Sequence, residues 1–405
     1  MSKTIPTRPS ANSWRNTPPL RPATGDSAVW RTTDVVRLTR RHVIGSMAAS
    51  GAVLAGGCAA RMAPPSRSGA WPQTSPASVG LKKEALEQAA HAMGQAGERQ
   101  GLVVVRDGAL VFERYWANDY HRAEPDWRNV SFSSGKSWGA TMVGRAINLG
   151  HLALDDPASR YVDPSITGLH PATRIHHLLT MSSGGSLVVK PSSHPPRKLN
   201  DQTPPGPPDE YVRTEGKSKE PRAPEGYGID LEPGTMFFYD GAAADHLAEI
   251  VTAATGMRSF DFMRNEVLEP LGCRNTGYQP EGVDSNGDIR IGGSMLISCR
   301  DMARLGQLYL QGGRWGSTRL LDAAFVDAAT SPSPGNPDYG FLWWLNTTGE
   351  IPAAPRSMFY AAGALGQYCF VVPERRLVVA TMGFGRPPLT PQRAWEILAP
   401  ALLAS

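Results

Sequence analysis

A chain of 405 residues with 41 % hydrophobic and 19 % charged residues has the composition of a globular protein, and it is long enough for one large domain with a split core. Ten Lys or Arg and only two Asp lie in residues 1–70, whereas the remainder holds 31 basic and 35 acidic residues, so the net charge of +4 comes from the N-terminal segment. This distribution gives no support for a nucleic-acid partner. The four cysteines form no C-x-x-C pair and the nine histidines no H-E-x-x-H motif, so a zinc-ribbon or thioredoxin-type site is unsupported.

The N-terminal segment has the pattern of an export leader. Residues 1–36 are polar and without periodicity, which predicts disorder. Within residues 37–61, the pair Arg40-Arg41 precedes a weakly apolar stretch of about 15 residues, which resembles a twin-arginine export signal and is too short to span a bilayer. We therefore expect an exported protein.

The leader ends in a stretch that also resembles a lipoprotein cleavage box, Leu54-Ala55-Gly56-Gly57-Cys58, although Ala55 stands where Leu is usual. Cys58 is then either a lipidation site, which would anchor a periplasmic protein to the membrane, or an ordinary small residue of the signal. Residues 62–76 are rich in Pro and Ser and are interpreted as a tether. The folded domain is expected over residues 77–405.

Both ends of this domain predict strands next to helices. Helical periodicity covers residues 81–93, and two β-rich runs at 102–105 and 109–112 flank Asp107-Gly108, a strong hairpin signal. A second hairpin is expected from residues 367–372 and 377–382, followed by a helix that Thr390-Pro391 opens. The pattern predicts an α+β fold in which strands from both chain ends form one antiparallel sheet flanked by helices.

The middle of the chain predicts a second, mainly helical lobe, and a cleft between the two parts is a natural place for chemistry. Ser298 and Asp301 have the spacing of a capping box before an amphipathic helix that ends near Gly312. Residues 187–226 hold many Pro, Lys, Arg and Ser and are expected to form an exposed insertion, which either rims the active site or is a plain excursion.

Ser133-Ser134-Gly135-Lys136 is the one S-x-x-K sequence in the chain. If a helix starts near Ser133, positions i and i+3 share a face, so the Lys136 amine lies close to the Ser133 hydroxyl. The helix N-terminus favours negative charge on the serine, and a buried lysine can accept its proton. The apolar residues that follow, up to Gly150, support this helix.

Two further segments have residue types that suit the same chemistry. Tyr239 ends an apolar run and is followed by turn residues, so its hydroxyl can project into a cleft as a base and then as an acid; the alternative is a core aromatic. Residues 361–367 are small and Gly-rich and lead into the C-terminal hairpin. Such a strand edge lets a substrate carbonyl approach backbone N–H groups, although a plain turn is also possible.

Together these elements resemble the class C β-lactamase family, which also contains D-alanyl-D-alanine carboxypeptidases, esterases of the β-lactamase fold and 6-aminohexanoate-dimer hydrolases. The likeness runs from about residue 80 to 400, and the supporting stretches are Gly150–Pro157, Thr173–Gly184, Gly292–Met295 and Tyr339–Trp344. It implies the β-lactamase/transpeptidase-like fold, without a metal or another cofactor. It further implies that Ser133 is acylated, that Lys136 takes or relays its proton, and that Tyr239 activates the deacylating water.

By the same resemblance, the N–H groups of Ser133 and Ala364 would form the oxyanion hole, and Asp240, Gly241 and Gly363 would lie at the substrate. The chain departs from the family's lactamases at two places. Their Y-x-N is here Tyr239-Asp240-Gly241, and their K-T-G is here Ala361-Ala362-Gly363, which lacks the cation that meets a substrate carboxylate.

These departures favour a small ester or amide substrate over penicillins and over peptides that end in a free carboxylate. Asp240 would be suited to a substrate amine. The leading hypothesis is thus a serine hydrolase of the esterase or 6-aminohexanoate-dimer hydrolase branch. The alternatives are a β-lactamase or D-alanyl-D-alanine carboxypeptidase and, in another class, a non-catalytic envelope protein that keeps the fold for binding.

Overall fold

The computed structural model describes residues 71–119, 121–184, 232–273, 275–279, 282–284, 286–384 and 389–403. The expected leader, the signal with Cys58 and the Pro-rich insertion at 187–226 lie outside these residues. Within them, no helix is long and apolar enough to cross a membrane.

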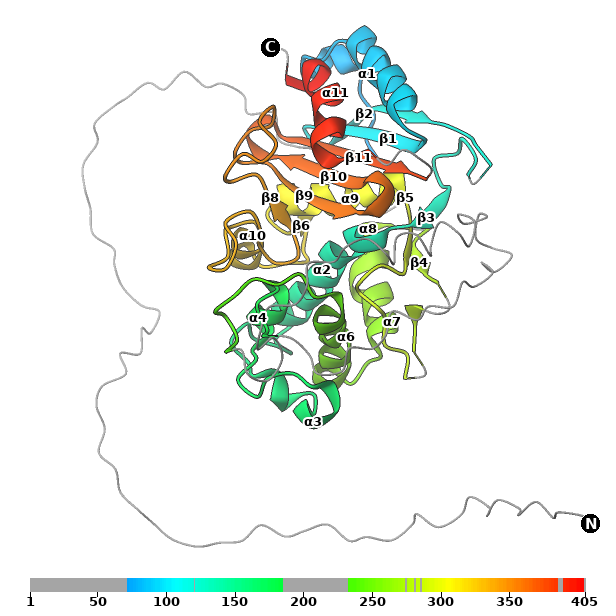
Figure 1. The fold of residues 1–405 in the computed structure, drawn as a ribbon. Helices are drawn as coiled ribbons and strands as arrows, with labels where there is room; N and C mark the ends of the chain where they lie inside the picture. The colour runs from blue at the N-terminus through cyan, green and yellow to red at the C-terminus, as the bar shows by residue number, and fades with distance from the viewer. Residues whose placement is uncertain are drawn as a thin grey trace, which may run out of the picture. The chain divides into compact units, whose positions relative to one another are not determined.

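One six-stranded antiparallel sheet joins the two ends of the domain, in the order β2-β1-β11-β10-β9-β8 (Figure 1). The expected hairpins are both present and meet in its centre, where Val103 of β1 faces Ala380 of β11. Its strands are β1 (Arg99–Arg106), β2 (Ala109–Tyr115), β8 (Trp344–Leu345), β9 (Phe359–Gly363), β10 (Gln367–Val372) and β11 (Leu377–Gly383).

Two smaller sheets complete the strands of the described residues. The first runs in the order β3-β5-β4, and the second pairs β6 with β7. Their strands are β3 (Arg128–Val130), β4 (Gly277–Tyr278), β5 (Met295–Ser298), β6 (Arg314–Trp315) and β7 (Thr318–Arg319). The chain enters the Ser133 region from β3, so the small sheet fixes where that region begins.

The helices divide between the large sheet and the helical part of the domain (Figure 1). They are α1 (Lys83–Ala96), α2 (Gly135–Asn148), α3 (Pro164–Thr167), α4 (Ile175–Leu179), α6 (Gly241–Thr255), α7 (Ser259–Phe262), a π-helical turn (Met263–Leu268), α8 (Glu269–Leu271), α9 (Cys299–Leu310), α10 (Ala323–Ala329) and α11 (Pro391–Leu403). The mixture of helices with an antiparallel sheet confirms the predicted α+β class.

The large sheet has two buried faces, and strand alternation sorts its side chains between them. Val104 and Val379 point to the face that α1 and α11 cover, where Trp395 is fully buried. Val103 and Ala380 point to the opposite face, which α9 covers. Ser298 caps α9 by accepting a hydrogen bond from the Asp301 N–H at 3.1 Å, as the sequence predicts.

The expected tether at 62–76 is wrong at its C-terminal end, because residues from Trp71 onward belong to the folded domain. The Leu110 N–H donates to the Pro72 carbonyl at 2.8 Å, and the Thr74 N–H donates to the Leu110 carbonyl at 3.1 Å. Trp71 is buried, with the guanidinium of Arg304 5.4 Å from its ring centre. Pro and Ser content predicted an open linker, but two backbone hydrogen bonds hold this segment to β2 and the Trp71 side chain packs in the core.

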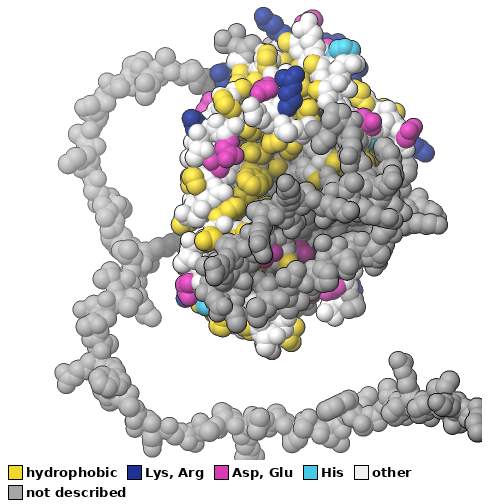
Figure 2. Space-filling view, in the orientation of Figure 1, with side chains coloured by type: hydrophobic (Ala, Val, Ile, Leu, Met, Phe, Trp, Pro, Cys, Tyr) yellow, Lys and Arg dark blue, Asp and Glu magenta, His cyan; other side chains and the backbone are white. Residues whose placement is uncertain are grey.

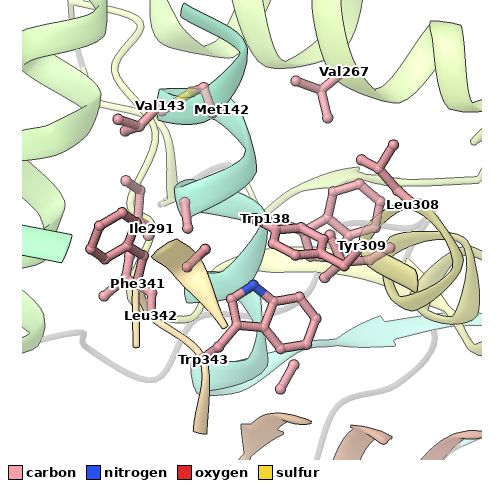
Figure 3. Packing of buried hydrophobic residues seen from close by; sticks show 14 of the residues in the cluster. Trp138, Met142, Val143, Val267, Ile291, Leu308, Tyr309, Phe341, Leu342 and Trp343 are labelled. Carbon is pink, nitrogen blue, oxygen red and sulfur yellow. The ribbon is translucent and has the colours of Figure 1, made fainter. Parts of the chain in front are cut away.

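Helix α2 begins directly after the turn that contains Ser133, the candidate nucleophile, and is buried over most of its length. Its side chains Trp138, Met142 and Val143 pack among residues from distant segments, including Ile291 and Trp343 (Figure 3). Burial of a helix on several sides holds its axis in one position. The first turn of α2 is therefore a rigid base for a reactive group.

Candidate active site

Ser133 lies between a strand and a buried helix. β3 ends at Val130, residues Phe132–Ser134 form a single 3₁₀ turn, and α2 begins at Gly135. The Ser134 hydroxyl donates to the Ser131 carbonyl at 2.7 Å and closes the turn. The helix thus starts two residues later than expected, and Ser133 belongs to the tight turn at its N-terminus.

Lys136 sits one turn along, as its spacing predicts. The Lys136 Nζ donates to the Ser133 Oγ at 3.1 Å and to the Gly292 carbonyl at 3.1 Å. The side chain is only 4 % exposed, so the amine is held between these two oxygens with little freedom to turn elsewhere. The arrangement places an amine that could accept or relay a proton within hydrogen-bond distance of the Ser133 hydroxyl.

Asp245 supports this lysine from behind and was not identified from the sequence. Its Oδ1 accepts the Gly292 N–H at 2.8 Å, on the same residue whose carbonyl meets Lys136. Burial raises the pKa of the Asp245 carboxyl, while the Gly292 N–H and the charge of Lys136 act in the opposite direction. The signal that could have found it is its place on the first turns of the helix that follows Tyr239.

Tyr239 comes from a separate segment and meets Lys136 in space. The Lys136 Nζ lies 4.8 Å from the centre of the Tyr239 ring, and that ring stacks on Trp344 at 5.9 Å. Tyr339 approaches it edge-on, with the ring centres 6.3 Å apart. Trp344 and Tyr339 hold the phenol in one orientation, with its ring against the amine.

The two residues after Tyr239 differ in what they do. The Asp240 Oδ1 accepts the N–H groups of Ala242 and Ala243 at 2.9 and 3.1 Å, so this carboxylate caps helix α6. That contact gives Asp240 a structural role which the sequence analysis did not predict. A Cβ on Gly241 would lie 3.7 Å from the Lys136 Nζ, so Gly241 borders the site.

Gly363 and Ala364 bring a strand edge to Ser133. Gly363 is the last residue of β9, and a Cβ there would lie 2.3 Å from the Ser131 carbonyl oxygen and 3.0 Å from the Ser134 nitrogen. No larger residue permits this approach without moving the backbone. The strand therefore lies directly against the Ser133 turn, with the Ala364 backbone beside it.

A pocket of about 310 Å³ opens at this point. Ser133, Tyr239, Gly363 and Ala364 line it together. Aromatic walls come from Trp344, Tyr360 and Tyr368, and hydrophobic side chains gather over β8 and β9 on the face shown in Figure 2. Among the described residues that line the pocket, the one formal charge belongs to the carboxylate of Glu350.

The sequence analysis missed the aromatic walls. Tyr360 lies on β9 and Tyr368 on β10, and both point to the α11 side of the sheet. Burial raises the pKa of both phenols above their usual value of about 10, so both stay protonated at neutral pH. Alternation along the predicted strands could have placed them on one face, but not next to Ser133.

No group of His, Cys, Asp and Glu suited to a metal occurs in the described part of the chain.

The fold is that of the β-lactamases and the penicillin-binding protein homologues. The chain matches the family described as Beta-lactamase over residues 86–401, and it therefore belongs to that family. No curated protein matches the chain significantly.

Several solved structures share the fold at low identity. A proposed 6-aminohexanoate-dimer hydrolase from Bacillus anthracis is 16 % identical with a TM-score of 0.60, and the match covers 84 % of this chain and 88 % of that one. EstCE1, a hydrolase with promiscuous acyltransferase activity, is 17 % identical with a TM-score of 0.59, over 81 % and 99 %. A penicillin-binding protein homologue from Caulobacter crescentus is 15 % identical with a TM-score of 0.57, over 79 % and 98 %.

Proposed function

We propose that this protein is a serine hydrolase that cleaves small esters or amides through an acyl-enzyme on Ser133. The observation that carries the proposal is the pairing of the Ser133 Oγ with the Lys136 Nζ at 3.1 Å, in a pocket that Tyr239 also lines. Two structures with the same fold support hydrolysis by acyl transfer at this site: EstCE1, a hydrolase with promiscuous acyltransferase activity, and the proposed 6-aminohexanoate-dimer hydrolase.

The proposed reaction has two halves. The Ser133 Oγ attacks the substrate carbonyl carbon while its proton passes to the Lys136 and Tyr239 pair, and the N–H groups of Ser133 and Ala364 bind the resulting oxyanion. The leaving alcohol or amine takes the proton as its bond to carbon breaks. Water, activated by Tyr239, then attacks the acyl carbon, releasing the acid and returning the proton to Ser133.

The charge of the pocket indicates the substrate class. A β-lactam or a peptide with a free terminal carboxylate needs a cation to receive that group. The described lining offers Glu350 instead, together with aromatic surface. We therefore propose that the substrates are esters and amides of the kind that esterases and 6-aminohexanoate-dimer hydrolases cleave. Their acyl part would be largely apolar and would carry either no charge or a positive charge.

Replacing the nucleophile tests the proposal. Wild type should react with a fluorophosphonate probe and hydrolyse p-nitrophenyl esters, whereas Ser133→Ala should take no label and lose about 10³-fold or more in kcat. Ser137→Ala is the matched control, because the Ser137 hydroxyl is buried and donates to the Leu342 carbonyl at 2.7 Å. Its labelling should persist. A wild-type protein that neither reacts nor turns over would instead support a binding protein.

The same assay ranks the two hydrolase classes. We expect neutral p-nitrophenyl esters and linear amides without a free carboxylate to be turned over with much higher kcat/KM than the cephalosporin nitrocefin, because nitrocefin presents a carboxylate to a pocket whose described lining residues include no cation. Ser133→Ala corrects each rate for background hydrolysis. Nitrocefin turnover at the ester rate would identify the β-lactamase alternative.

A further inference from the structure

The turn that carries Ala364 is backed by a buried arginine. Residues Ala364–Gly366 join β9 to β10, and both Leu365 (φ 62°) and Gly366 (φ 85°) have left-handed backbone conformations. A left-handed leucine costs free energy, because its Cβ crowds the following carbonyl. Such a turn persists where surrounding contacts hold it.

Arg99 supplies those contacts. From the first position of β1, its Nη2 donates to the Gly366 carbonyl at 2.6 Å, and its Nη1 reaches the Leu365 carbonyl at 3.5 Å. The Nη2 also donates to the Thr381 Oγ1 of β11 at 2.8 Å. One guanidinium thus ties the carbonyls of both left-handed residues to the centre of the sheet.

The site is built to contain this group. Arg99 is 2 % exposed, and among the described residues it forms no ion pair. A Cβ on Gly366 would lie 2.5 Å from the Arg99 Nη1, and one on Gly383 would lie 2.2 Å from it, so two glycines leave the space that the guanidinium fills. Burying a guanidinium without a carboxylate is unfavourable. Burial lowers the Arg99 pKa to about 10, so the side chain keeps its charge near neutral pH.

We propose that Arg99 is a positioning residue of the oxyanion hole, which aims the Ala364 N–H at the substrate by fixing the carbonyls of Leu365 and Gly366. The inference rests on the proposed acyl-enzyme function, in which Ala364 supplies one of the two N–H donors. Arg99 is not among the described residues that line the pocket, so it would act through the turn. Its effect is therefore on the transition state, where the oxyanion forms, and not on the binding of the neutral substrate.

The test compares Arg99→Met and Arg99→Lys with wild type, with all rates normalised to sites titrated by a fluorophosphonate. Arg99→Met should lower kcat for a p-nitrophenyl ester about 10²-fold with KM changed by no more than about threefold, because a donor displaced by about 1 Å costs that much. A trifluoromethyl ketone that mimics the tetrahedral intermediate should lose affinity by a similar factor. Arg99→Lys keeps the charge but cannot reach both carbonyls, so it should fall between.

Thr381→Val is the matched control, since the Thr381 hydroxyl bonds to Arg99 and to the Gly101 carbonyl but to neither carbonyl of the turn. Its kcat should stay within about threefold of wild type. A lowered melting temperature with unchanged kcat per titrated site in the Arg99 variants would overturn the inference and leave a structural role. If Arg99→Met does not fold, Arg99→Lys decides by the same measurements. A wild type without label or turnover would instead refute the proposed function.

Discussion

Besides its hydrogen bond to Ser133, the Lys136 amine is held by the backbone of Gly292. Its Nζ meets the carbonyl of Gly292, and the N–H of that same residue is fixed by the Asp245 carboxylate at 2.8 Å. Glycine allows the backbone to pass close to this carboxylate, since a Cβ on Gly292 would lie 3.3 Å from the Asp245 Oδ1. Asp245 thereby fixes the position of Gly292, and through the Gly292 carbonyl it fixes the position of the Lys136 amine beside Ser133.

Removal of Asp245 should therefore affect both stability and rate. Asp245→Ala leaves the Gly292 N–H without its acceptor, which we expect to lower the free energy of unfolding by about 1 to 3 kcal/mol and kcat by about 10-fold or more. Asp245→Asn keeps an oxygen acceptor and should recover most of both. Urea unfolding and ester turnover measure the two effects. Equal losses in Ala and Asn variants would show that the negative charge, rather than the hydrogen bond, matters.

At the scale of elements, Gly306 lets helix α9 pack closely against the sheet. A Cβ on Gly306 would lie 2.6 Å from the Val378 Cγ1 and 2.7 Å from the Cys369 Sγ, in the layer between α9 and strands β10 and β11. Cys369 is completely buried, and burial raises the pKa of its thiol to about 12, so it acts as a packing group. The close approach brings the helix against the strands that lead away from Ala364.

Substitution of Gly306 tests this packing. In an exposed helix, Gly→Ala would stabilise by about 1 kcal/mol, whereas Gly306→Ala should destabilise by about 1 to 3 kcal/mol because the layer is already filled. Thermal or urea unfolding gives the sign. The exposed position His91 of α1 is a control, where His91→Ala should change stability by less than about 0.5 kcal/mol. A stabilised Gly306→Ala variant would contradict the close packing.

At the scale of the whole molecule, one buried and one half-buried histidine link stability to pH. The His121 ring is 3 % exposed, and its Nδ1 donates to the Trp116 carbonyl at 2.8 Å. Burial, opposed by that hydrogen bond and aided by the nearby charge of Arg99, lowers the His121 pKa from 6.5 to about 4. Burial and the neighbouring His176 lower the pKa of His177 in the same way, also to about 4.

These shifts predict a loss of stability in mild acid. Above pH 6.5 the rings are neutral in both states, so their contribution is constant; between about pH 6.5 and 4 the unfolded chain binds protons that the folded chain excludes. The free energy of unfolding should therefore fall as the pH drops through this window. Urea titrations at pH 7 and 5 should show a smaller loss for His121→Asn than for wild type. Equal losses would refute the assignment.

Local patterns predicted the elements of this protein well. Asp107-Gly108 between two β-rich runs, and the turn before Leu377, gave the two hairpins that form the centre of the sheet. The S-x-x-K spacing placed Lys136 beside Ser133, since one helical turn joins residues three apart. These features follow from backbone geometry and side-chain type over a few residues. The tether was misjudged, because composition does not reveal that one tryptophan has a place in the core.

The sequence by itself determined the two hairpins, the α+β class that follows from them, and the pairing of Ser133 with Lys136, because each is encoded within one turn or one strand pair. Only the tertiary structure brought Gly292, 156 residues away, to Lys136, and Arg99 to the turn 267 residues further on. It also decided that aromatic walls and one carboxylate surround Ser133. Contacts of this kind depend on how packed layers meet, and no local periodicity records that.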